Sequence, residues 1–204
     1  MNATPPATVL LFLDENDLPV LFPLLHQGFQ LTATVGCDIQ CLLCDQFKLD
    51  PEYLADRIST IFLDGKPVDD VASAVVRDGA TLALSAAMPG LVGATFRKAG
   101  HLAPFRGVIS YQKEADCPTA SQDGWITLKL FNLLLSELGP LFLKRGIWIG
   151  GGVLRDALNR QPPGLQPLCK KIELNGEELP PERMTRLEWI SPDTRYFLKV
   201  NCDV

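Results

Sequence analysis

The stretch TIFLDGKPVDD, residues 60–70, is the clearest local signal for a fold in this chain. An apolar run is followed by Asp64-Gly65 and then by a second run. This pattern is typical of a tight β-hairpin, because glycine tolerates the positive φ that such a turn requires. Another Asp-Gly pair, at residues 78–79, precedes an apolar run at residues 81–86. These residues therefore predict a hairpin followed by a further strand.

Three segments nearer the N-terminus have the pattern of strands. Residues 8–13 form a short apolar run, and residues 29–35 alternate apolar with polar side chains, as a half-buried strand does. Residues 20–25 are also apolar but contain Pro23, which favours an edge strand or a bulge over a helix interior. We therefore expect a strand at residues 20–25, a turn at the sequence HQG and a second strand at residues 29–35.

Two helices are expected between this pair of strands and the hairpin. Asp50 is well placed as an N-cap, with Pro51 at the first helical position of a short helix that runs to about Ile58. If residues 37–48 are also helical, one arc of that helix is apolar and faces the core: Ile39, Leu42, Leu43 and Phe47. The opposite arc then carries Cys37, Cys41, Cys44 and Lys48.

This order of hairpin, helix, helical turn, hairpin and closing strand over about residues 20–90 resembles the β-grasp, or ubiquitin-like, fold. The resemblance is closest to the sulfur-carrier branch, meaning the small subunit of molybdopterin synthase and the carrier of thiamine biosynthesis. It implies an α+β fold class with an N-terminal β-grasp-like unit. We do not expect carrier chemistry, because a sulfur carrier activates a Gly-Gly carboxylate at a free C-terminus and this chain continues to NCDV.

The rest of the chain predicts a second region of mixed helix and strand. We expect a glycine-rich connection at residues 89–100, which divides the chain into a β-grasp-like domain at residues 1–95 and an α+β region at residues 96–204. Residues 125–138 have the length and the leucine content of one long buried helix. The sequence GIWIGGGVLRDALN, residues 146–159, predicts a strand, a glycine-rich turn and a helix.

The sequence KIELNGEEL predicts a further strand, turn and strand, and it repeats the first hairpin. The pattern I-x-L-D-G at residues 61–65 returns as I-x-L-N-G at residues 172–176. A degenerate duplication explains this echo, and so does the turn chemistry that unrelated hairpins share. The residues alone leave both explanations open.

Composition excludes several classes of partner. The chain has 204 residues, a formal net charge of −5 and 47% hydrophobic residues, and its basic residues form no run beyond pairs. We therefore expect a globular protein that binds no nucleic acid. Acidic residues interrupt the first apolar stretch, and no segment approaches the roughly 20 apolar residues of a membrane span. The expected localisation is cytoplasmic, where thiols stay reduced, and no membrane partner is expected.

The sequence GCDIQCLLCDQF, residues 36–47, spaces three cysteines as C-x3-C-x2-C. Small buried thiols facing another part of the chain would explain the spacing. The alternative is a metal site in which Cys37, Cys41 and Cys44 bind zinc or an iron-sulfur cluster, or act as redox thiols, since radical S-adenosylmethionine enzymes hold a cluster with a similar spacing. A fourth zinc ligand would come from His26, His101, Cys117, Cys169 or Cys202.

These observations favour a binding or assembly module without catalysis, which uses exposed strand edges or the helix face to bind a protein partner or a second copy of the chain. The alternative hypothesis is the thiolate protein. No Ser/His/Asp or Cys/His arrangement can be placed from the residues alone, so no catalytic residue is predicted.

Overall fold

The computed structural model describes residues 7–87, 90–112, 121–159, 169–180, 183 and 187–202. It contains helices together with parallel and antiparallel strands, which confirms the α+β class. The chain divides into two compact units: unit 1 is Met1–Phe29 with Ser136–Val204, and unit 2 is Gln30–Leu135. These units differ from the expected domains at residues 1–95 and 96–204, because the N-terminal strand pairs with two strands from the C-terminal part of the chain.

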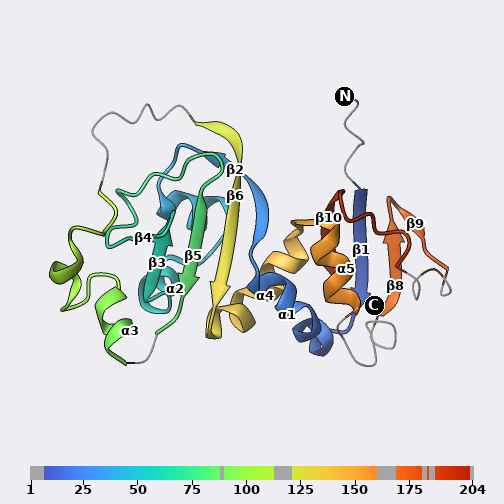
Figure 1. The fold of residues 1–204 in the computed structure, drawn as a ribbon, viewed down its shortest axis with the longest axis horizontal. Helices are drawn as coiled ribbons and strands as arrows, with labels where there is room; N and C mark the ends of the chain where they lie inside the picture. Colours follow the sequence, from blue (N-terminus) through green and yellow to red (C-terminus); the bar gives the residue numbers. More distant parts are fainter. Residues whose placement is uncertain are drawn as a thin grey trace. The chain divides into compact units, whose positions relative to one another are not determined.

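Unit 2 is built on a mixed sheet with the strand order β4-β3-β5-β6-β2 (Figure 1). Its strands are β2 (Phe29–Val35), β3 (Thr60–Leu63), β4 (Lys66–Pro67), β5 (Thr81–Ser85) and β6 (Gln122–Phe131). β3 is antiparallel to β4 and to β5, whereas β5 is parallel to β6. The strands predicted at residues 29–35 and 81–86 and the predicted hairpin are all present.

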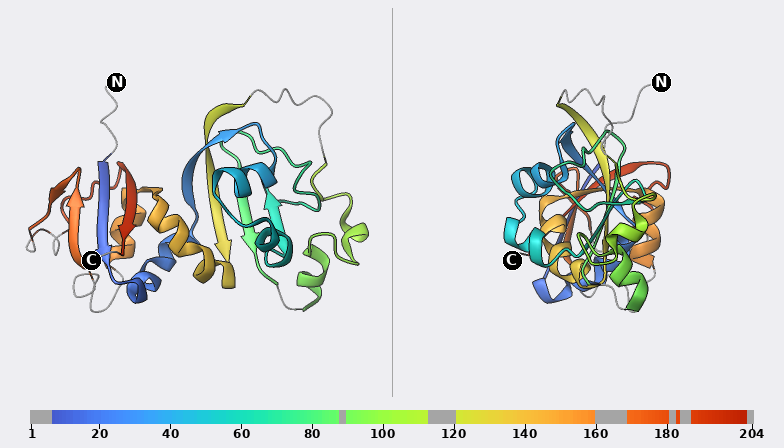
Figure 2. Two further views of the ribbon diagram at one scale, coloured as in Figure 1. Left: turned by 180° about the vertical axis from the view of Figure 1, so that it is seen from behind. Right: turned by 90° about the vertical axis from the view of Figure 1, so that its left-hand side faces the viewer.

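The helical segments of unit 2 are η2 (Cys41–Gln46), α2 (Pro51–Asp56), α3 (Gly90–Phe96) and η3 (Ala103–Arg106). η2 is a π-helix, in which the N–H of Phe47 donates to the carbonyl of Leu42 at 3.1 Å. Asp50 caps α2 as predicted, because its carboxylate accepts from the N–H of Glu52 at 2.7 Å. η2 and α2 lie together on one face of the sheet (Figure 2).

The apolar arc predicted for the cysteine segment faces the core. Ile39, Leu42 and Leu43 are fully buried, and Phe47 is 1% exposed. The sheet meets this arc with the buried residues of its inner face: Ile61, Leu63, Leu82, Leu84, Ile126, Leu128 and Leu130. Because side chains alternate along a strand, the residues between these positions lie on the opposite face of the sheet, which we call the open face of unit 2.

Unit 1 is built on a second set of strands with the order β7-β10-β1-β8-β9 (Figure 1). Its strands are β1 (Ala7–Leu13), β7 (Ile147–Gly150), β8 (Cys169–Leu174), β9 (Glu177–Glu178) and β10 (Arg195–Asn201). Its helical segments are η1 (Glu15–Leu21), α1 (Phe22–His26), α5 (Gly151–Asn159) and most of α4 (Leu133–Arg145). β1 is parallel to β10 and antiparallel to β8. The strands predicted at residues 8–13 and in KIELNGEEL are present.

Three predicted elements are wrong. Residues 20–25 are helical and not a strand, because Pro23 lies in the first turn of α1, where a helix needs no N–H. Residues 125–138 are not one buried helix but the end of β6 and the start of α4. The alternation of buried and half-exposed residues along β6 is a period of two, and Asn132, with φ of 55°, separates strand from helix. Residues 90–96 form α3 instead of an open connection.

The two units share one strand order. The central strand, β5 in unit 2 and β1 in unit 1, runs parallel to one neighbour and antiparallel to the other in both units. The register also agrees: Leu63 lies opposite Leu82 in unit 2, and Leu174 lies opposite Val9 in unit 1. A helical segment connects β2 to β3 and another connects β7 to β8.

The hairpin turns of the two units match in their hydrogen bonds as well. The carboxylate of Asp64 accepts from the N–H of Thr81 at 2.7 Å, and the side-chain oxygen of Asn175 accepts from the N–H of Thr8 at 2.8 Å. Both turn residues have a positive φ, 50° and 54°, and both are followed by glycine. The echo between residues 61–65 and 172–176 therefore falls at equivalent positions of two units with one spatial strand order. The connectivity differs, because the central strand β5 follows its hairpin in the sequence whereas β1 precedes its own.

Candidate ligand-binding site

The three clustered cysteines are half-buried: Cys41 and Cys44 lie in η2, whereas Cys37 lies between β2 and the helical residues. The thiol of Cys37 donates to the carbonyl of Thr34 at 3.3 Å and accepts from the side-chain N–H of Gln46 at 3.2 Å. These contacts hold Cys37 against β2 with protein partners. Cys41 and Cys44 lie on the helix that carries the buried core residues, as the pattern predicted. The prediction of a helix over residues 37–48 is wrong at both ends, because Cys37 precedes the helical residues and Lys48, with φ of 64°, follows them.

Two thiols of this segment, those of Cys37 and Cys44, have a raised pKa. Burial, followed by the neighbouring Cys41, raises the pKa of Cys37 from 9.0 to about 11. Burial, followed by Asp45 and Asp50, also raises the pKa of Cys44. A thiol acts as a nucleophile in its thiolate form, and both shifts favour the protonated form of these two thiols at neutral pH.

The metal site at Cys37, Cys41 and Cys44 stays a prediction. Within the described ranges, no group of three or more His, Cys, Asp or Glu side chains is arranged to hold a metal ion. The residues considered for a fourth ligand lie on separate elements: His26 ends α1, Cys169 begins β8, and His101 and Cys202 lie beyond α3 and β10. Cys117 lies outside the described residues.

The backbone N–H groups of the glycine-rich turn that leads into α5 donate to carbonyl groups of residues 192 and 194 in the same unit. The N–H of Gly151 donates to the carbonyl of Thr194 at 2.7 Å, and the N–H of Gly152 donates to the carbonyl of Pro192 at 3.2 Å. A side chain at Gly151 would collide with the carbonyl of Ser191. The glycines therefore permit a close backbone approach within unit 1.

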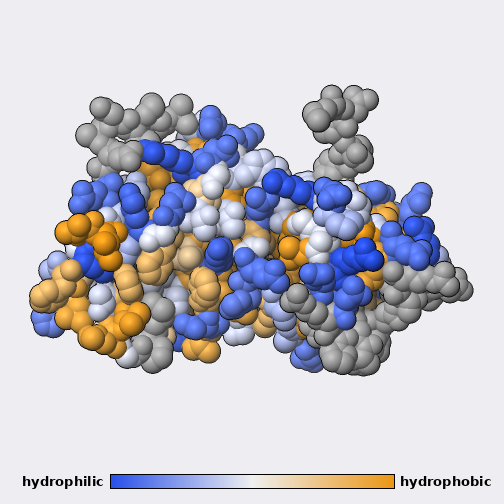
Figure 3. Space-filling model, viewed as in Figure 1, coloured by the Kyte–Doolittle hydropathy of each residue, from blue (hydrophilic) through white to orange (hydrophobic). Residues whose placement is uncertain are grey.

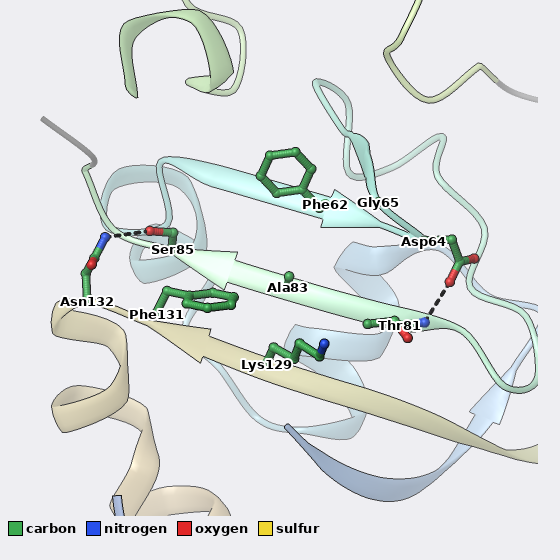
Figure 4. A pocket seen from close by; sticks show the side chains of 9 residues that line it. All are labelled: Phe62, Asp64, Gly65, Thr81, Ala83, Ser85, Lys129, Phe131 and Asn132. Atoms are coloured by element: carbon green, nitrogen blue, oxygen red, sulfur yellow. Dashed lines mark hydrogen bonds between the residues drawn. The ribbon is translucent and has the colours of Figure 1, made fainter. Parts of the chain in front are cut away.

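A hollow of about 780 Å³ lies on the open face of unit 2, over β3, β5 and β6 (Figure 4). Small-molecule sites usually have volumes of roughly 300–1,000 Å³. Aromatic, small, hydroxylic and charged residues line it: Phe62, Asp64, Gly65, Thr81, Ala83, Ser85, Lys129, Phe131 and Asn132. All of them belong to unit 2.

The strand register explains why the surface is hollow at this point. Phe62, Ala83 and Lys129 lie opposite one another across the three strands. Ala83 is the small residue in the centre of that row, between two long side chains, so the floor of the hollow is low. Phe131, on the next row, adds a second aromatic wall on β6 (Figure 4). The result is an apolar trough that runs along β5.

Polar groups lie at both ends of the trough. At one end the side-chain N–H of Asn132 donates to the hydroxyl of Ser85 at 3.0 Å. At the other end Asp64 is held by its bond to the N–H of Thr81 (Figure 4). Lys129 lies between the ends, half-buried, and makes no ion pair with any described residue.

The segment at residues 90–112, which contains α3 and η3, is fixed beside the trough. The ring of Phe96 lies 5.4 Å from the ring of Phe62. Arg106 is buried, and its guanidinium donates to both carboxylate oxygens of Asp69, at 2.6 and 3.1 Å. Asp69 also accepts from the N–H of Ala99 at 2.9 Å. One carboxylate thus binds both the connection between α3 and η3, at Ala99, and the last residue of η3, Arg106.

This segment also presents apolar side chains to solvent, visible as orange atoms over α3 and η3 (Figure 3). The exposed residues are Leu91, Val92, Phe105, Val108 and Ile109, with exposures from 54% to 97%. Large apolar residues gathered on a surface are typical of interaction sites. No helix among the described residues has the length and apolar character needed to cross a membrane.

Sequence reasoning missed the trough, although it placed its hairpin correctly. The missed signal is the alternation in residues 125–131, where Thr127, Lys129 and Phe131 are half-exposed and the residues between them are buried. Interpreted as a helix, this segment cannot place Lys129 and Phe131 on the same face as Ala83. None of the known protein families, curated proteins and solved structures with which the chain was compared matches it.

Proposed function

We propose that this protein is a non-catalytic binding module and that it binds a small organic molecule in the trough of unit 2. The observation that supports this proposal best is the volume of about 780 Å³ together with its lining. Two phenylalanines and an alanine supply apolar contact, and a few polar groups at defined places supply orientation, which is the composition of ligand sites.

The proposal includes the fold. A helix between the strands β2 and β3, a hairpin and a closing strand β5 beside its parallel neighbour support a β-grasp-like unit. The strand beside β2 is β6, which follows the closing strand in the sequence instead of preceding β2. Because unit 1 has the same strand order, we extend the proposal to a pair of β-grasp-like units in one chain.

The test is to fill the trough with the residue that unit 1 has at the same position. Leu10 in β1 is equivalent to Ala83 in β5, because each lies opposite the second residue before the Asp-Gly or Asn-Gly turn of the neighbouring hairpin. The variant Ala83→Leu places a larger side chain at the floor of the trough. Leucine fits at this strand position in unit 1, where the residue is Leu10. We expect it to weaken binding of small aromatic ligands at least tenfold, which corresponds to about 1.4 kcal/mol.

Binding is measured by two-dimensional NMR titration with a small aromatic library, following the amide signals of β3, β5 and β6. A second variant, Phe131→Asn, removes an aromatic wall and also copies unit 1, whose equivalent residue is Asn201. Circular dichroism and urea unfolding establish that both variants fold. The proposal fails if folded Ala83→Leu and Phe131→Asn bind the library as the wild type does, or if the wild type shows no shifts on these strands.

A further inference from the structure

Resting on the proposed binding function, we infer that the ligand is an apolar molecule with one anionic, oxygen-rich group, and that Lys129 pairs with this group. The apolar part lies over Ala83, between Phe62 and Phe131. Figure 4 shows the ammonium of Lys129 directed toward Thr81, and a turn of this flexible side chain brings it toward Ser85 and Asn132. The anionic group binds there, at the end of the trough away from Asp64.

The charge of Lys129 is the first reason. A lysine ammonium offers three donors and no acceptor, and this one lies half-buried among aromatic residues without an ion-pair partner in the described parts of the chain. A negatively charged group on the ligand would form an ion pair with this ammonium. A carboxylate, sulfonate or phosphate ester supplies that charge with several acceptor oxygens.

The groups at the Ser85 end are also donors. The hydroxyl oxygen of Ser85 accepts from Asn132, so its own proton remains available to a further acceptor. The amide of Asn132 has a second N–H. Each of these donors matches an oxygen-rich group on the ligand. Ser85 is the last residue of β5, and Asn132 directly follows the last residue of β6.

A buried hydroxyl lies next to these donors. Thr60 lies directly opposite Ser85 across β3 and β5, and is 1% exposed. Its hydroxyl has no hydrogen-bond partner among the described residues. Buried polar groups nearly always have one. Thr60 itself does not line the trough, so its hydroxyl adds a polar group behind the Ser85 end and does not contact the ligand.

The opposite end of the trough sets the direction of the ligand. Asp64 is the carboxylate at that end, and Figure 4 shows it beside Thr81, away from Ser85 and Asn132. The strand between Thr81 and Ser85 spans about 13 Å, from four residues at about 3.3 Å each. Repulsion from Asp64 therefore favours the anionic group at the far end.

The experiment compares two probes of one shape, 2-naphthoate and 2-naphthamide, which share the ring system and differ in charge. Both are titrated at millimolar concentration into the wild type, Lys129→Gln and Lys199→Gln. Lys199 is the matched control, because it occupies the position in β10 that Lys129 occupies in β6. We expect Lys129→Gln to weaken naphthoate binding about fivefold and to leave naphthamide binding unchanged, whereas Lys199→Gln changes neither.

The outcomes separate this inference from the proposed function. Equal binding of naphthoate and naphthamide, lost together in Ala83→Leu and unaffected by Lys129→Gln, would overturn the anionic ligand and leave the trough as the site. Binding of neither probe to the wild type would overturn both. Because Lys129 is half-exposed at a strand position, the glutamine variant is expected to fold, and its far-ultraviolet circular dichroism verifies this.

Discussion

The open faces of the two units show how one strand arrangement carries two kinds of surface. Equivalent positions in units 2 and 1 are Thr60 and Lys171, Phe62 and Glu173, Ala83 and Leu10, Ser85 and Phe12, Lys129 and Lys199, and Phe131 and Asn201. Unit 2 has small residues on its central strand and aromatic residues beside it. Unit 1 has large residues on its central strand and charged residues beside it.

Charged residues of β8 and β9 in unit 1 pair with one another. Lys171 pairs with Glu173 at 2.7 Å and with Glu178 at 3.3 Å, and its ammonium lies 5.1 Å from the ring centre of Phe12. Leu10 and Phe12 occupy the positions at which unit 2 has Ala83 and Ser85. The difference teaches that the fold leaves this face free to vary, and that the residues of the central strand decide whether it is filled or hollow.

The largest expected difference between the units concerns their ion pairs. Asp69→Ala leaves the guanidinium of Arg106, whose side chain is 2% exposed, without its carboxylate. We expect a loss of about 3 kcal/mol in the free energy of unfolding. This is the smallest loss expected when a buried ion pair is broken, because the side chain of Asp69 is partly exposed to water. Glu173→Ala breaks a half-buried pair of unit 1 but leaves Lys171 its second partner Glu178, so the expected loss is below about 1 kcal/mol.

Urea unfolding measures both losses, and amide hydrogen exchange shows where they act. Exchange should increase at residues 90–112 in Asp69→Ala, because this carboxylate binds both Arg106 and the N–H of Ala99. Asp69→Asn serves as the control, since it keeps an acceptor oxygen and should lose less. Equal losses in Asp69→Ala and Glu173→Ala would show that burial does not distinguish the two pairs.

The features that sequence could predict are local, and those it could not predict depend on distant pairing. Asp64-Gly65 and Asn175-Gly176 predict their hairpins, because a tight turn requires residues that tolerate a positive φ. The trough, in contrast, arises where Ala83 of β5 meets Lys129 of β6, two strands separated by residues 86–121. Nothing local in LALS indicates that its alanine will lie between a phenylalanine and a lysine.

The cysteine segment shows the same limit. Its helical pattern predicts correctly that Leu42 and Leu43 are buried and that Cys41 and Cys44 are more exposed. Spacing alone could not decide whether three thiols converge. That depends on backbone geometry and on partners such as Gln46, whose amide bonds both the thiol of Cys37 and the carbonyl of Thr34.

A smaller effect tests whether the two hairpin turns are equivalent in energy as well as in geometry. Asp64→Ala and Asn175→Ala each remove one side-chain acceptor and place alanine at a positive φ. We expect each to lower the free energy of unfolding by about 1–2 kcal/mol, from the lost hydrogen bond and the strained backbone. The exchanges Asp64→Asn and Asn175→Asp keep the acceptor and should change it by less than about 0.5 kcal/mol.

Urea unfolding of the four variants checks this prediction. The loss should be similar in the two alanine variants, because each turn residue keeps a second, backbone hydrogen bond to the same threonine. The N–H of Asp64 donates to the carbonyl of Thr81 at 2.9 Å, and the N–H of Asn175 donates to the carbonyl of Thr8 at 2.8 Å. A loss confined to one unit would mean that the shared geometry does not carry a shared stability.

The smallest expected effect concerns thiol ionisation in the two units, since burial raises the pKa of Cys37 in unit 2 and of Cys169 in unit 1. The unfolded thiol loses its proton near its ordinary pKa of 9.0, whereas folded Cys37 keeps its proton up to about 11. Above pH 9 the unfolded chain therefore binds fewer protons, and the free energy of unfolding falls as the pH rises toward 11.

For Cys37, which remains partly exposed, water reduces this effect to about 0.5 kcal/mol. Urea unfolding at a series of pH values measures how the free energy of unfolding changes with pH. Cys37→Ser should reduce this change between pH 9 and 11 and should not alter the pH dependence below pH 9. Cys169→Ser should act in the same direction, because the cause of the shift in unit 1 is again burial. An unaltered pH dependence in Cys37→Ser would show that this thiol ionises alike in the folded and unfolded chain, and would restore it as a candidate nucleophile.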